Sequence, residues 1–98
     1  MIVRITDEAE DNLELIGDQI AKDNPDRAVT FVRELHESYQ GLAEFSERFP
    51  LVARYETKGV RSRLHGNYLI FYRIEPEQVV VLNILHGAQD YAAILFPQ

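Results

Sequence analysis

The sequence has no cysteine and only three histidines among its 98 residues. Without cysteine, the chain has neither a disulfide framework nor a thiolate nucleophile. The histidines are 21 residues or more apart, so no short stretch has the ligand spacing of a metal site. A glycine-rich phosphate loop and a G-x-S-x-G nucleophile elbow are also missing. We therefore expect no metal and no cofactor.

Long apolar runs are missing as well. No segment approaches the roughly 18 uncharged apolar residues that a membrane span needs, and the first residues turn acidic without the apolar core of a signal peptide. We therefore expect a cytoplasmic protein. With 46% hydrophobic residues, five Gly and four Pro, the chain is too apolar to be disordered. Its length predicts a single domain over residues 1–98.

Positive charge is scarce and unevenly placed. Residues 1–50 contain twelve Asp and Glu against five Lys and Arg, a net of −7, and residues 51–98 contain four against five, a net of +1. The two halves sum to the overall charge of −6. Because phosphate neutralisation supplies most of the non-specific affinity for nucleic acids, we expect no direct DNA binding. Within residues 51–74, five cations stand against Glu56 alone: Arg54, Lys58, Arg61, Arg63 and Arg73.

The first half of the chain predicts a pair of helices. Thr6 or Asp7 caps a first helix over residues 7–22, in which apolar residues recur at one-face spacing. A second helix starts at Asn24-Pro25 and ends before Pro50, because the residue before a proline avoids the α region. The short connection between the helices predicts an antiparallel hairpin.

The second half predicts a mainly antiparallel sheet. Strands are expected at one sheet edge over residues 1–5, and over residues 60–65, 68–74 and 79–85. The last two strands are apolar on both sides, so both of their faces are covered. The helix hairpin covers one face, and the C-terminal segment, a partner or both cover the other. A short last helix over residues 90–95 completes an α+β fold of order β-α-α-β-β-β(-α).

Three arginines and one histidine are the candidates for chemistry. Strand alternation puts Arg61 and Arg63 on one open face, and Arg73 on the adjacent strand is expected near them. Such guanidinium groups bind phosphate or carboxylate, but a solvated strand face explains the same pattern. His86 ends the most apolar strand, where it is either a general acid–base or a strand-end histidine bonded to the backbone.

Four further residues each have a plain interpretation. Asp90 either orients His86 or caps the short helix that follows it. Leu15 lies on the acidic face of the first helix and is either part of a partner groove or a single exposed leucine. His65 precedes a Gly-Asn turn and is expected at the surface, and Tyr55 is expected to face solvent from a loop.

The most distinctive stretches are DEAEDNLELI in the first helix, RAVTFVREL after Asn24-Pro25 with one residue between, YLIFYR in the third strand, and ILHGAQD at the end of the fourth. With the element order above, the chain resembles the ParE/RelE superfamily of small bacterial toxins. The resemblance covers nearly the whole chain. It implies a RelE/ParE-like fold and a toxin of a type II toxin–antitoxin system, of the kind linked to plasmid stabilisation.

The superfamily has two branches with different activities. RelE-like members are metal-independent, ribosome-dependent mRNA endonucleases, and ParE-like members inhibit DNA gyrase and are not nucleases. A nuclease site here would use Arg61, Arg63, Arg73 and His86. Leu69 and Gln89 stand where RelE-like chains have arginines, which leaves such a site short of the cations that a phosphate transition state needs. The resemblance thus implies the ParE-like branch with no catalytic residues, with a RelE-like nuclease and a non-toxic binding module as the alternatives.

The resemblance also implies a cognate antitoxin, ParD-like or of another family, whose disordered tail folds onto the toxin. We expect that tail to be acidic and to contact three of these cations and three apolar residues, namely Arg61, Arg63, Arg73, Leu69, Phe71 and Leu15. The C-terminal tail is the candidate for contact with the target, through Asp90, Tyr91, Leu95 and Phe96.

Overall fold

The computed structural model describes residues 1–98 and has the predicted order of elements. Three single-turn 3-10 helices, at Gly41–Ala43, Ser46–Arg48 and Glu56–Lys58, connect the helix pair to the second strand. The strands and α-helices are β1 (Ile2–Ile5), α1 (Asp7–Ala21), α2 (Pro25–Gln40), β2 (Val60–His65), β3 (Tyr68–Ile74), β4 (Gln78–His86) and α3 (Tyr91–Leu95).

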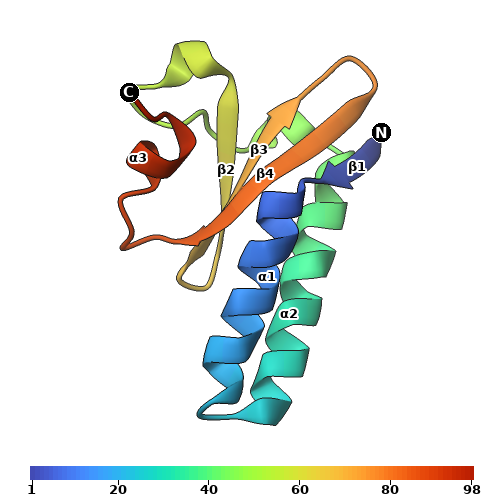
Figure 1. Ribbon diagram of the computed structural model, residues 1–98. Helices are drawn as coiled ribbons and strands as arrows, with labels where there is room; N and C mark the ends of the chain where they lie inside the picture. Colours follow the sequence, from blue (N-terminus) through green and yellow to red (C-terminus); the bar gives the residue numbers. More distant parts are fainter.

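Both long helices begin where the sequence places their caps. The Thr6 hydroxyl accepts a hydrogen bond from the Ala9 N–H, and the Asn24 side chain accepts one from the Arg27 N–H. Each cap satisfies an amide group that has no partner inside its helix. The helices lie side by side as the predicted hairpin (Figure 1). No helix of the chain combines the length and the apolar character that crossing a membrane requires.

The four strands form one sheet in the order β1-β4-β3-β2. β1 lies at an edge, as predicted, and runs parallel to β4, while the other neighbouring strands are antiparallel. β4 extends one residue beyond the predicted strand at each end. Gly66 starts the two-residue turn between β2 and β3 with a φ of 59°, a conformation that residues with a Cβ rarely adopt.

The two faces of the sheet carry different cores. The helix hairpin lies on one face and the C-terminal segment with α3 on the other (Figure 1). The larger core joins α1 and α2 to inward residues of β3 and β4, among them Leu35, Ile70, Tyr72 and Ile84. The smaller core contains Val52, Val60, Phe71 and Leu85, covered by residues that include Tyr55, Leu69, Leu82, Tyr91, Leu95 and Phe96. Both faces of β3 and β4 are covered, as the apolar pattern predicts.

Side chains of α1 and its cap complete the outer edge of β4, where β1 is too short to reach. The Thr6 hydroxyl donates to the Leu82 carbonyl oxygen at 2.8 Å. The Oδ1 atom of Asn12 accepts from the Asn83 Nδ2 at 3.1 Å and from the Ile84 N–H at 3.0 Å. These contacts satisfy polar groups that would otherwise lie unpaired between helix and sheet.

Candidate functional site

Two arginines of β2 hold the segment that follows α2. Arg61 donates from Nη1 to the carbonyl oxygens of Phe49 at 2.7 Å and Glu47 at 3.1 Å. Arg63 donates from Nη1 to the Ser38 carbonyl oxygen at 2.9 Å. Both are half-buried on the sheet face that carries the helix hairpin. The prediction that they stand on an open sheet face is wrong, because backbone carbonyl groups of the covering segment lie against them.

Arg73 lies on the other face of the sheet. The β2–β3 register places it directly opposite Val60, and residues directly opposite in a sheet share a face. Val60 belongs to the smaller core under the C-terminal segment. Arg73 instead forms an ion pair with Glu75, with 3.0 Å between Nη2 and Oε2. The prediction that Arg73 lies beside the arginines of β2 is therefore wrong.

A third guanidinium group joins the two of β2. Arg63 lies over the Phe49 ring at 4.9 Å from its centroid, and Arg48 lies near the same ring at 5.7 Å. A Cβ on Gly41 would lie 3.3 Å from the Arg63 Nη1, a tight contact that the guanidinium group would have to relieve by a few tenths of an ångström. The three ion pairs of the chain all lie elsewhere. Arg48, Arg61 and Arg63, here called the arginine strip, therefore have no carboxylate partner.

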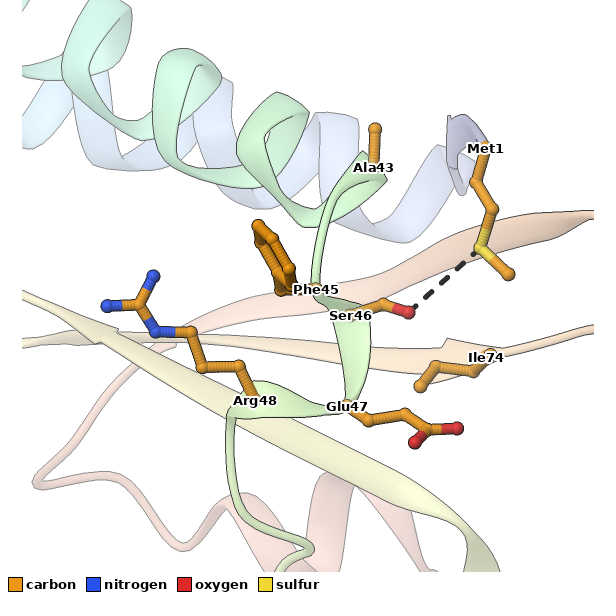
Figure 2. Close-up of a pocket in the computed structure, with 7 residues that line it drawn as sticks. All are labelled: Met1, Ala43, Phe45, Ser46, Glu47, Arg48 and Ile74. Atoms are coloured by element: carbon orange, nitrogen blue, oxygen red, sulfur yellow. Dashed lines mark hydrogen bonds between the residues drawn. The ribbon is translucent and has the colours of Figure 1, made fainter.

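An apolar hollow lies beside the turn formed by residues 45–49 (Figure 2). Its lining residues are Met1, Ala43, Phe45, Ser46, Glu47, Arg48 and Ile74. Phe45 is 78% exposed and has a φ of 54°, in the left-handed region. The Tyr72 hydroxyl donates to the Ser46 carbonyl oxygen from the core below. Burial raises the pKa of Tyr72, and the nearby Arg61 and Arg63 partly offset this.

His65 has a structural role that its position before a turn did not predict. Its Nδ1 lies 2.9 Å from the Ser38 Oγ, and its Nε2 lies 3.1 Å from the Glu34 Oε1. Glu34 also pairs with Arg27. Hydrogen bonds from Arg27 and then His65 lower the pKa of Glu34. The side chain of His65 thus joins the end of β2 to α2 and is not a free surface group.

His86 is bonded to the backbone at the strand end. Its Nδ1 accepts a hydrogen bond from the Ala88 N–H at 3.0 Å, and its ring packs edge-on against Tyr68 at 5.2 Å between centroids. Because β3 lies between β4 and β2, His86 is roughly 10 Å from the β2 backbone, two strand spacings away. The strand-end interpretation describes these contacts. The four candidate nuclease residues therefore do not converge on one point.

Many residues expected to contact the antitoxin or the target are packed against each other on the sheet face covered by the C-terminal segment, here called the second face. Phe71 is 0% exposed, and the Tyr91 ring lies 5.1 Å from it. Phe96 stacks on Tyr55 with centroids 4.4 Å apart and an interplanar angle of 15°. The predictions of an accessible Phe71 and a solvent-facing Tyr55 are wrong, because the C-terminal segment covers both. The Oδ1 atom of Asp90 accepts from the Ala93 N–H, so the helix-cap interpretation holds for this residue.

The remaining antitoxin candidates lie far apart in the fold. Leu69 is half-buried in the smaller core, opposite the hairpin. Leu15 is 56% exposed on α1 and lines a separate hollow with residues of the β4 end. The structure therefore does not unite the six predicted antitoxin contacts on one surface. Arg61 and Arg63 lie together on the hairpin face, with Arg48 as a neighbour that the sequence did not indicate, whereas Leu69, Phe71 and Arg73 share the opposite face.

Comparison with known proteins supports the toxin resemblance. A model of the ParE toxin of the type II toxin–antitoxin system parDE matches residues 3–91. The chain belongs to the ParE toxin family. A comparison with curated proteins gave no significant match to this ParE-family chain.

Two solved structures share the fold of this ParE-family chain. One is the chromosomal ParDE toxin–antitoxin system from P. aeruginosa, with a TM-score of 0.76 at 20% identity, covering 88% of this chain and 95% of that one. The other is the RelBE2 toxin–antitoxin complex from Mycobacterium tuberculosis, with a TM-score of 0.64 at 26% identity, covering 87% of this chain and 95% of that one. The RelE/ParE-like fold predicted from the sequence is confirmed.

Proposed function

We propose that this ParE-family toxin inhibits DNA gyrase by protein–protein contact and is neutralised by a cognate antitoxin. One observation carries the choice between the two activities of the superfamily. Arg61 and Arg63 are bonded to backbone carbonyl groups on the hairpin face, Arg73 is paired on the opposite face, and His86 lies two strands away. A metal-independent ribonuclease needs such groups around one phosphate.

Leu69 and Gln89 stand where RelE-like chains have arginines, and their contacts also disfavour a nuclease. Leu69 lies in the smaller core, and the Gln89 side chain accepts a hydrogen bond from the His86 N–H at 2.8 Å. Neither residue supplies a positive charge to a cleaved phosphate group. Catalysis of phosphate cleavage depends on preorganised cations aimed at the developing charge. The four candidate nuclease residues form no such arrangement, so inhibition by binding accounts for them better than RNA cleavage does.

The antitoxin part of the proposal is supported by charge and by the relatives. The arginine strip has three cations without a carboxylate partner in a chain of net charge −6. Both solved relatives are toxin–antitoxin systems. An acidic antitoxin tail would supply the missing carboxylates and would order as it binds. Since both proposed partners act in the cytoplasm, we expect this chain there too.

Expression of the chain alone in bacteria tests the proposal. We expect growth arrest with induction of the DNA-damage response while protein synthesis continues, and relief when the adjacent antitoxin gene is co-expressed. Immediate translation arrest with cleaved mRNA would instead indicate the nuclease alternative. Harmless expression would indicate a non-toxic binding module. As a control, the Arg61→Ala, Arg63→Ala double variant should remain toxic at an equal level of folded protein, since a gyrase inhibitor does not need these residues for catalysis.

A further inference from the structure

The hollow beside residues 45–49 exposes a large aromatic side chain on a hydrogen-bonded turn. Phe45 is 78% exposed, and its φ of 54° is one that residues with a Cβ rarely adopt. Met1, also exposed, and Ile74 line the same hollow (Figure 2). Exposed apolar side chains that gather around a hollow mark interaction sites more often than single ones do.

The turn that displays Phe45 is held by one hydrogen bond within the turn and by three from Tyr72 and Arg61. The Arg48 N–H donates to the Phe45 carbonyl oxygen at 2.9 Å. The Tyr72 hydroxyl donates to the Ser46 carbonyl oxygen, and Arg61 donates to those of Glu47 and Phe49. A surface held in this way loses little conformational entropy when a partner binds, which favours affinity.

Arg48 links the hollow to the arginine strip. It lines the hollow and also lies near the Phe49 ring. Arg63 lies over the same ring, and Arg61 donates a hydrogen bond to the Phe49 carbonyl oxygen. In Figure 2, the Arg48 and Glu47 side chains project to opposite sides of the turn. The hollow therefore has a cationic end, which continues into the arginine strip, and a second end where the apolar Met1 and Ile74 lie on the side to which Glu47 projects.

We infer that the hollow and the arginine strip form one docking site for an acidic segment of the antitoxin that carries a large apolar side chain. The apolar side chain packs against Phe45, and neighbouring carboxylates pair with Arg48 and the strip. This inference rests on the proposed antitoxin. Charge complementarity selects the occupant, because the three guanidinium groups have no acidic partner in the chain. A nucleic acid fits less well, since residues 1–50 carry a net charge of −7.

Titration calorimetry of the purified toxin with the antitoxin encoded beside it tests the inference. Phe45→Asn removes the aromatic ring, yet Asn tolerates the left-handed conformation, so the variant should fold with an equal or higher melting temperature. We expect it to weaken antitoxin binding at least about tenfold, as the loss of a central aromatic contact does. Arg48→Glu should weaken binding by a similar factor and reduce its salt dependence.

Two matched variants serve as controls. Val29→Asn removes an apolar side chain that is 62% exposed on α2, and Lys58→Glu makes the same charge change near the second face. Both should bind within about twofold of the wild type. If the wild type binds the antitoxin and the Phe45→Asn and Arg48→Glu variants bind it equally tightly, the docking site is overturned and the proposed function still stands. Absence of wild-type binding would overturn antitoxin neutralisation itself, and equal competition by a single-stranded RNA would assign the site to nucleic acid.

Discussion

The Nη1 atom of Arg61 lies 2.7 Å from the carbonyl oxygen of Phe49, so an arginine suited to gripping a partner also fixes the turn beside the docking site. The same group reaches the Glu47 carbonyl oxygen. Its hydrogen bonds hold residues 47–49 in place, and its positive charge lies beside the proposed antitoxin site. Substitution of Arg61 should affect both the stability of the fold and antitoxin binding, while Arg48 should affect binding alone.

Arg61→Ala should lower the free energy of unfolding by about 1–2 kcal/mol, since hydrogen bonds from a charged donor contribute about 1.5–3 kcal/mol and this one is half-exposed. Lysine should not restore the loss, because an ammonium group cannot reproduce the fork of a guanidinium. Urea denaturation measures the effect. The exposed Arg33→Ala on α2 is the control and should stay within about 0.5 kcal/mol of the wild type. Equal stability of Arg61→Ala and Arg33→Ala would contradict a role of Arg61 in holding the turn of residues 45–49.

Tyr72→Phe should destabilise the protein by about 1–3 kcal/mol, because it leaves the Ser46 carbonyl oxygen without its buried donor. The amide of Arg48, which bonds to Phe45 within the same turn, should also exchange its hydrogen faster. Hydrogen exchange followed by mass spectrometry checks this. Tyr55→Phe keeps the aromatic stack and removes a hydroxyl without a protein partner, so its exchange and stability should match the wild type.

Acid should weaken the contact between α2 and the end of β2. Arg27 and His65 lower the pKa of Glu34 in the folded state, so its carboxylate stabilises the fold above the unfolded-state pKa of about 4.3. That contribution is lost as the pH falls from this value toward the lower folded-state pKa. Glu34→Gln should therefore have a lower melting temperature than the wild type at pH 7 and a smaller further loss on acidification to pH 3. Glu37→Gln, which removes no ion pair, should retain the wild-type pH dependence.

The C-terminal segment should contribute to stability through its aromatic contacts. Phe96→Ala removes the ring that stacks on Tyr55 and should cost about 1–3 kcal/mol, below the roughly 3–5 kcal/mol of a fully buried Phe. Guanidinium denaturation gives the value. Gln98→Ala, an exposed change in the same segment, should have no measurable effect. A Phe96→Ala variant as stable as the wild type would mean that the aromatic stack of this segment contributes nothing to the free energy of unfolding.

The sequence alone predicts the order of elements, the helix caps, the edge position of β1 and the covered faces of β3 and β4. These features depend on local chemistry and on periodicity, which a single chain displays directly. The faces of Arg61 and Arg73 follow instead from strand register. Alternation within each strand was visible, but the pairing of Val60 with Arg73 was not.

The neighbourhood of residues 45–49 was also hidden in the sequence. Phe45 lies in a short connection whose left-handed conformation no glycine or asparagine signals. The contacts of His65 with Glu34 and Ser38 join residues about 30 positions apart, beyond the reach of any local pattern. Tyr55 and Phe71 were misplaced because the path of the C-terminal segment across the sheet is a tertiary feature.

A supercoiling assay with purified DNA gyrase tests the central claim most directly. Relaxed plasmid, ATP and gyrase are incubated with increasing amounts of the toxin, alone or after mixing with its antitoxin. We predict that the toxin stops supercoiling, that the antitoxin restores it, and that His86→Ala inhibits as well as the wild type. Unchanged supercoiling at a large excess of folded toxin, with cleavage of ribosome-bound mRNA in a parallel reaction, would contradict the account.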